Sequence, residues 1–260
     1  MARNFVDASS QHLLVASSPV SGPPFTLFAW HQNDTNLTQG AIVVLNSAGQ
    51  QATLHRSFGD AQFIRFDGSG FVNIVGVSAF LITGTWVAVG MSAYAADSTE
   101  AFVNGVSVGT SATSANESLS RTRIAATDTF AAMGSFNDGR IACVAVWNVG
   151  LSAAEHAALA KGVSPLLIRR ANLVAFWPLF GRTGTADEPA IVGTPDLTVS
   201  GDGGAGDNPS VVRIYAPRLR TRVVPVPLVP AAPPRPYPED GSLGGGGHSR
   251  IWISGFVSYV

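Results

Sequence analysis

Acidic residues are the side chains of this 260-residue sequence best suited to catalysis. Hydrolysis of a glycosidic bond needs a carboxylic acid with a raised pKa beside a carboxylate that acts as nucleophile or base. No two glutamates lie close together on one expected strand, so the sequence does not supply such a pair. We therefore predict that the protein is not an enzyme. The glutamates are Glu100, Glu117, Glu155, Glu188 and Glu239.

One aromatic and polar segment is suited to sugar binding instead. Trp30 precedes His31, Gln32, Asn33 and Asp34, and an aromatic face beside amide groups suits a pyranose ring. The alternative interpretation is that Trp30 packs in the core while Asn33 and Asp34 form a turn. The candidate carbohydrate residues are therefore Trp30, His31, Asn33 and Asp34.

Metal-ligating side chains are sparse in this sequence. Cys143 is the single cysteine, which excludes an internal disulfide and a cysteine metal cluster. It lies in an apolar run, so we expect a buried, unreactive thiol. The five histidines show no metal-ligand spacing. The residues themselves predict no cofactor.

The elements that must position these side chains are short strands separated by Gly, Ser, Asn and Asp clusters. Their number and close spacing favour an all-β sandwich or barrel over βαβ units. Residues 141–147 are apolar on both faces, which predicts a central, covered strand. The expected strands are residues 25–31, 41–46, 51–57, 62–67, 71–77, 86–93, 100–103, 106–110, 123–126, 140–148 and 173–179.

Two local motifs make specific structural predictions. Asn104 and Gly105 lie between apolar runs, and Asn-Gly accommodates the positive φ angles of a type I′ hairpin turn. Ser152 and Glu155 form a capping-box pattern, which predicts one short helix that ends near Gly162.

Composition limits the classes of partner. Charged residues make up 13% of the chain, against roughly 25% in typical soluble domains. A chain so poor in charge either buries much of its surface in a core or covers it with partners. Net charge is −1, so no overall field attracts nucleic acid or anionic lipid, and no apolar run approaches the ~18 residues of a membrane span. We expect no membrane partner and no nucleic-acid partner.

The composition changes after residue 200, which suggests a sandwich over 1–200 and an arm over 201–260. Residues 201–209 read as a flexible loop or linker, and half of the 16 prolines lie between Pro217 and Pro238. Proline lacks an amide donor, so this stretch is expected to run as an extended Pro/Gly-rich C-terminal arm. Its candidate partner-docking residues are Arg218, Arg220, Arg222, Tyr237, Trp252, Phe256 and Tyr259.

Several motifs resemble those of LamG-like, concanavalin A-like jelly-roll domains, in the same order. The opening 4–13, the strand 24–30, the tryptophan strand 86–90 with the hairpin at 101–105, and the closing strand and helix at 133–155 carry the resemblance, which covers about residues 1–180. It implies an antiparallel two-sheet sandwich. The segment 173–179 is similar to a continuation found in bacteriophage structural proteins.

The resemblance also bears on ligands. Some LamG-like domains bind Ca²⁺ at the rim of the sandwich through carboxylates and carbonyls. Loop position makes Asp60, Asp67, Asp97 and Asp138 the candidates for such a site.

Fold does not fix function, so two functions stay open. The first is a non-enzymatic virion structural protein, a capsid decoration, cement or head/tail-fibre subunit. It would be assembled in the host cytoplasm as a homo-oligomer and would dock on other virion subunits through the arm. The second is a carbohydrate-binding, lectin-like adhesion module that recognises host-surface polysaccharide.

Overall fold

The computed structural model describes residues 2–35, 39–57, 59–76, 83–129, 132–181, 186–193, 195–201, 204–206 and 209. The chain divides into a unit spanning Met1–Arg218 and a second unit spanning Leu219–Val260, and the described residues all belong to the first. No helix in the described part of the chain is long and apolar enough to cross a membrane.

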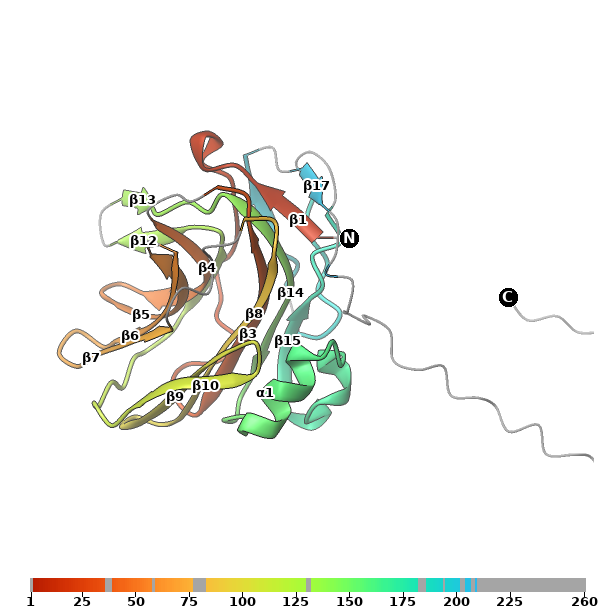
Figure 1. Ribbon diagram of the computed structural model, residues 1–260. Helices are drawn as coiled ribbons and strands as arrows, with labels where there is room; N and C mark the ends of the chain where they lie inside the picture. The colour runs from red at the N-terminus through yellow and green to blue at the C-terminus, as the bar shows by residue number, and fades with distance from the viewer. Residues whose placement is uncertain are drawn as a thin grey trace, which may run out of the picture. The chain divides into compact units, whose positions relative to one another are not determined.

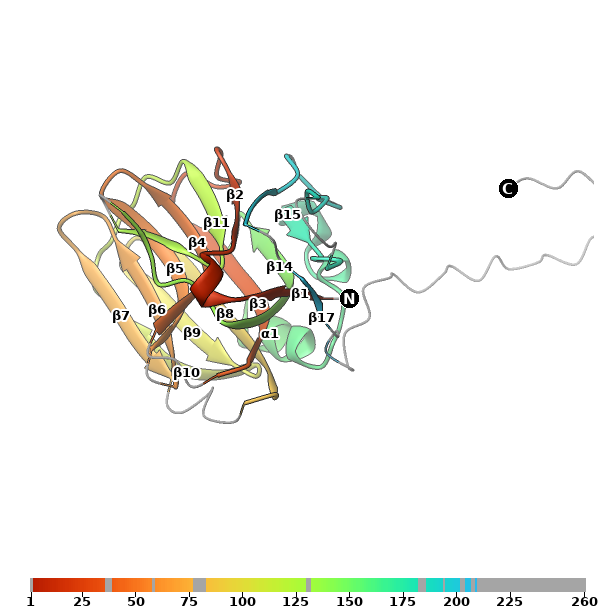
Figure 2. The ribbon, with the colours of Figure 1, turned by 90° about the horizontal axis from the view of Figure 1, so that it is seen from above.

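The described unit is a jelly-roll sandwich of two antiparallel sheets (Figures 1 and 2). Sheet A follows the strand order β10-β9-β8-β3-β14-β1-β17, and β15 also pairs with β14. Its strands are β1 (Ala2–Phe5), β3 (Phe25–Asn33), β8 (Trp86–Ala95), β9 (Ser98–Val103), β10 (Val106–Ser111), β14 (Gly139–Trp147), β15 (Leu173–Trp177) and β17 (Gly204–Gly206).

Sheet B is the second layer and follows the order β16-β2-β11-β4-β5-β6-β7. A separate hairpin, β12 with β13, contacts β4. The strands are β2 (His12–Val15), β4 (Gln39–Ser47), β5 (Gln50–Ser57), β6 (Asp60–Phe66), β7 (Phe71–Gly76), β11 (Arg121–Ile124), β12 (Thr127–Thr129), β13 (Ala132–Gly134) and β16 (Thr198–Ser200).

All eleven strands expected from the sequence overlap observed strands, and the two local motifs form as predicted. Asn104 and Gly105 have φ angles of 50° and 76°, as a type I′ turn requires. The helix α1 (Ala153–Ala160) begins after Ser152, whose N–H donates to Glu155 Oε2 over 2.8 Å, and Gly162 has a φ of 84°. The other described helices are the 3-10 turns η1 (Asp7–Ser9), η2 (Pro165–Leu167) and η3 (Arg170–Asn172).

One loop prediction is wrong. The stretch 201–209 is predicted to be a flexible loop or linker, but Gly204–Gly206 forms β17 and pairs with β1. The reason is non-local, because β1 offers an open edge beside β14 that a short strand of small residues can fill.

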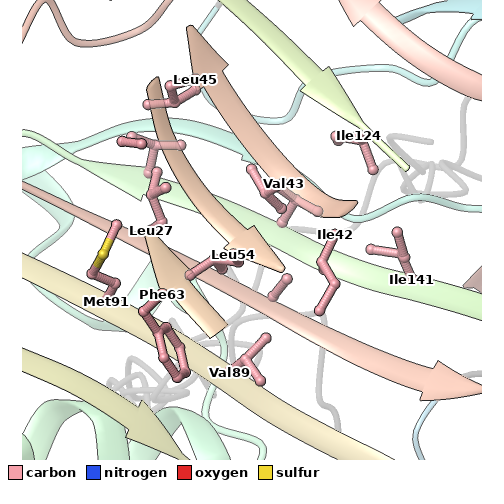
Figure 3. Close-up of a cluster of buried hydrophobic side chains, with 14 of the residues drawn as sticks. Leu27, Ile42, Val43, Leu45, Leu54, Phe63, Val89, Met91, Ile124 and Ile141 are labelled. Atoms are coloured by element: carbon pink, nitrogen blue, oxygen red, sulfur yellow. The ribbon is translucent and has the colours of Figure 1, made fainter. Parts of the chain in front are cut away.

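The inter-sheet core consists of the alternate side chains that point from each sheet toward the other. Figure 3 shows Leu27, Val89 and Met91 of sheet A facing Val43, Leu54 and Phe63 of sheet B. Because these residues point inward, their strand neighbours must point outward, which places the polar side chains of sheet B on the face turned away from sheet A.

A second core lies on the outer face of sheet A, under α1. It contains Trp30, Cys143, Trp147 and Leu159, so β14 is covered on both faces as predicted. Cys143 has a φ of 53° at a bulge in β14, and burial raises the pKa of its thiol to about 12. The thiol is therefore buried and protonated at neutral pH, as the sequence suggested.

His156 of α1 packs against sheet A and connects the helix to it. Its ring stacks on Phe102 with centroids 3.9 Å apart and lies above Gly90, where a Cβ atom would meet the ring at 2.6 Å. Its Nε2 lies 2.9 Å from Ser92 Oγ. Burial lowers the pKa of His156 to about 3, so the contact is made by the neutral imidazole.

Candidate functional site

The strand pairings of sheet B set polar and aromatic side chains in rows on its outer face, which we call the polar face. Strands lie about 4.8 Å apart, so a row across five strands spans roughly 19 Å. That length suits a short oligosaccharide better than a single ring. The rows are Arg121–Asn46–Gln51–Phe66–Phe71, Arg123–Val44–Thr53–Ile64–Asn73 and His55–Gln62–Val75.

The β7 end of the polar face is aromatic and open. Phe71 is 54% exposed and meets Phe66 edge-on, with ring centroids 6.2 Å apart. Val75, on the same side of β7, is also exposed. An exposed phenylalanine on an edge strand gives no folding benefit from burial, but it offers an apolar platform to a ligand.

The centre of the polar face is buried and polar. Asn46, Thr53 and His55 are 2%, 1% and 7% exposed. Asn46 Oδ1, Thr53 Oγ1 and His55 Nδ1 make no hydrogen bond within the described part of the chain. A buried polar atom without a partner costs about 1–3 kcal/mol, so three together indicate a place where water or a ligand supplies the missing partners.

The charge state of this centre follows from its burial. Burial lowers the pKa of His55 to about 4, and the positive charge of Arg56 acts in the same direction against a side-chain hydrogen bond to Gln62. His55 is therefore neutral above pH 5 and can donate from one ring nitrogen and accept at the other. Arg121 and Arg123 on β11 make the adjoining end of the face basic.

The residues predicted for sugar binding do not share one surface. Trp30 is buried on the outer side of sheet A, whereas His31 and Asn33 point between the sheets. His31 Nε2 lies 2.9 Å from Asn137 Oδ1, and Arg56 Nη1 donates to Asn33 Oδ1 over 2.5 Å. Burial lowers the pKa of His31 to about 3. Asp34 is exposed at the end of β3.

The predicted docking residues of the arm lie outside the described residues. Their role stays a prediction. They are Arg218, Arg220, Arg222, Tyr237, Trp252, Phe256 and Tyr259.

The aspartates considered for Ca²⁺ are spread over the sandwich. Asp60 and Asp67 lie at opposite ends of β6, and the Asp67 carboxylate accepts hydrogen bonds from the backbone N–H groups of Ser69, Gly70 and Asn116. These bonds hold the pKa of Asp67 well below its usual range. Asp97 is in the turn before β9, and Asp138 accepts from Thr35. Among the described residues, no group of three or more histidine, cysteine or acidic side chains is placed to hold a metal.

Each described glutamate has a structural contact. Two are in buried ion pairs, Glu117 with Arg65 at 2.7 Å and Glu188 with Arg3 at 3.1 Å. Glu155 pairs with Arg169 at 2.5 Å, and Glu100 accepts from the Tyr94 hydroxyl. Glu239 lies outside the described residues. These contacts give each of the four described glutamates a structural partner.

The residues of the polar face are not among the predicted site residues, although part of the signal is present in the sequence. Gln51, Thr53 and His55 alternate with apolar and inward residues along β5, which marks an outward polar side. The alternation does not show that Thr53 and His55 are buried, because burial depends on segments distant in the sequence.

Two curved antiparallel layers with a polar, partly aromatic outer face define a lectin-like jelly-roll domain. The chain belongs to the concanavalin A-like lectin/glucanases superfamily, whose family model matches residues 7–155. No curated protein sequence is significantly similar to it.

Solved structures share the fold at low sequence identity. A Bacteroides ovatus protein to which carbohydrate binding is ascribed superposes with a TM-score of 0.59 at 18% identity, covering 82% of this chain and 61% of that one. A heptameric SAP-like pentraxin from Limulus polyphemus superposes with a TM-score of 0.50 at 14% identity, covering 61% of this chain and 81% of the pentraxin chain. The CBM40 of Ruminococcus gnavus IT-sialidase also superposes with a TM-score of 0.50 at 14% identity, covering 62% of this chain and 98% of the CBM40 chain.

Proposed function

We propose that this domain is a non-catalytic carbohydrate-binding module whose ligand lies on the polar face of sheet B. One observation carries the proposal: exposed Phe71, in edge-on contact with half-buried Phe66, shares this face with three buried polar atoms that have no partner in the described chain. A saccharide presents an apolar C–H face and hydroxyl groups that both donate and accept. It is complementary to both halves of the face.

The structural contacts of the four described glutamates support binding without hydrolysis. Each of the four described glutamates already contacts a structural partner. If one of these carboxyl groups turned toward a substrate, it would give up an ion pair, a helix cap or a tyrosine contact. Similarity to carbohydrate-binding folds supports the same class of ligand, although fold by itself does not assign it.

A glycan array followed by calorimetry tests the proposal. Phe71→Ala removes the exposed platform and is expected to weaken binding about tenfold, which corresponds to about 1.4 kcal/mol. Leu167→Ala is the matched control, because Leu167 in η2 is also about half exposed but lies away from sheet B. Wild-type binding that Phe71→Ala leaves unchanged would refute the assignment of this face.

We also propose an assembly role in a virion, formed in the host cytoplasm with other subunits of the particle. Its support is compositional: 13% charged residues and eight prolines between Pro217 and Pro238. A truncation that removes residues 213–260 should remain folded and fail to assemble. Its incorporation into particles would contradict this role, and the glycan proposal would be unaffected.

A further inference from the structure

A pocket of about 530 Å³ opens on the outer face of sheet A, on the opposite side of the sandwich from the polar face. It lies where β3, β8 and the β9–β10 turn approach the end of α1. Its volume is within the range of about 300–1,000 Å³ of small-ligand sites. The residues that define it are Trp30, Thr85, Trp86, Asn104, Ala160 and Pro209.

The floor of the pocket is apolar and aromatic. Trp30 pairs with Ala88 across β3 and β8, and Trp86 lies two residues before Ala88, so both indoles are on the same face of the sheet. Trp30 belongs to the second core, and Trp86 and Ala160 pack against it while remaining half-buried. A half-buried indole beside an open volume is a stacking surface for a flat or ring-shaped ligand.

The rim of the pocket carries a hydrogen-bond donor in a fixed orientation. Asn104 N–H donates to the Ala88 carbonyl over 2.7 Å, and Asn104 Oδ1 accepts from the Ala88 N–H over 3.0 Å. These two bonds lock the side-chain amide, so its Nδ2 is the group left for a ligand. Thr85 is an exposed residue that also lines the pocket, and a threonine hydroxyl can donate or accept.

We propose that this pocket is a second saccharide site, in which one sugar ring stacks on Trp86 and a ring hydroxyl accepts from Asn104 Nδ2. The ligand class rests on the proposed function of the polar face. The location adds a new property, because sites on the outer faces of sheets A and B point in opposite directions. One domain then binds two glycan chains at once and cross-links them.

Asn104→Asp is the decisive variant. Aspartate tolerates the positive φ of this turn and keeps the acceptor for Ala88 N–H, but it removes the Nδ2 donor and adds a negative charge. Asn148→Asp is the matched control, since Asn148 is exposed, accepts from Asn172 Nδ2 and lies at the far end of β14.

The probes are linear tetrasaccharides of glucan, galactan, mannan and xylan, titrated by calorimetry into the full chain. Wild-type protein and Asn148→Asp are expected to bind two molecules, and Asn104→Asp one. Phe71→Ala is expected to keep the pocket site unchanged and to weaken the polar-face site about tenfold. The Trp86 indole N–H signal is assigned in an NMR spectrum by its loss in Trp86→Phe. In Phe71→Ala, ligand binding at the pocket should shift this signal.

The outcomes separate the two sites. A single site that Phe71→Ala weakens about tenfold and Asn104→Asp leaves unchanged would overturn the pocket proposal and support the polar face. A single site that Asn104→Asp abolishes and Phe71→Ala leaves unchanged would support the pocket and contradict binding at the polar face. Failure of every probe to bind wild-type protein would overturn both proposals.

Discussion

Replacing Thr53 by valine should make the ligand-free protein more stable and the glycan complex weaker. Valine has nearly the shape of threonine but no hydroxyl. Thr53 is 1% exposed, and its Oγ1 makes no hydrogen bond within the described residues. An unsatisfied buried hydroxyl costs about 1–3 kcal/mol, so Thr53→Val should raise the free energy of unfolding by about 1–2 kcal/mol.

A threonine with a satisfied hydroxyl supplies the control. Thr122 in β11 is fully buried, and its Oγ1 donates to the Ser17 carbonyl over 2.9 Å. Thr122→Val leaves that carbonyl without its donor and should destabilise the protein by about 1–3 kcal/mol. The same chemical change is therefore expected to have opposite effects on stability at two positions of one sheet, in β5 and in β11, which β4 separates.

Urea denaturation with thermal melting measures both variants. One kcal/mol corresponds to a shift in Tm of about 2–4 °C in a domain of this size, so the two variants should differ by several degrees. Destabilisation of Thr53→Val by 1 kcal/mol or more would show that Oγ1 is already hydrogen-bonded in the free protein. The buried centre of the polar face would then lack the unmet hydrogen bonds that motivate a ligand there.

Three further predictions concern pH, charge and backbone. Burial lowers the pKa values of the three histidines His31, His55 and His156 to about 3–4, so the unfolded chain binds more protons than the folded one below pH 6.5. Stability measured by denaturation should therefore fall from pH 7 to pH 5, less steeply in His156→Gln, and a flat profile would contradict the burial of these rings. Glu117→Gln should lower the free energy of unfolding by about 3–5 kcal/mol, because it leaves the buried charge of Arg65 uncompensated. A decrease below about 1 kcal/mol in urea denaturation would contradict this reasoning. Gly105→Ala should lower Tm more than Gly68→Ala, although both glycines have a positive φ. A Cβ at Gly105 would lie 2.6 Å from Ala157 Cα, whereas a Cβ at Gly68 would meet nothing within 4 Å. Equal shifts in Tm would refute the steric reason.

The parts of the fold with local causes were predictable from the sequence. The hairpin depends on the φ preferences of two adjacent residues, and α1 depends on the spacing of Ser152 and Glu155. β1 had no such signal. Its buried Arg3 is tolerated because Glu188 lies 3.1 Å away in space although 185 residues away in sequence.

The candidate site was less predictable for the same reason. Thr53 and His55 show their outward direction in the alternation of β5, but their burial comes from other segments. Trp30 is conspicuous in the sequence, yet the side of the sheet it occupies is set by its pairing with Ala88. Side-chain direction along a strand is local information, and the surroundings of a side chain are not.

The position of β1 between β14 and β17 also has a consequence for synthesis on the ribosome. β1 pairs with residues 139–141 on one side and residues 204–206 on the other, so more than 130 further residues must be made before its first edge can be filled. Such distant pairing slows folding and leaves an early strand edge open to wrong partners. Both edges of β1 would therefore stay unpaired until β14 has been made.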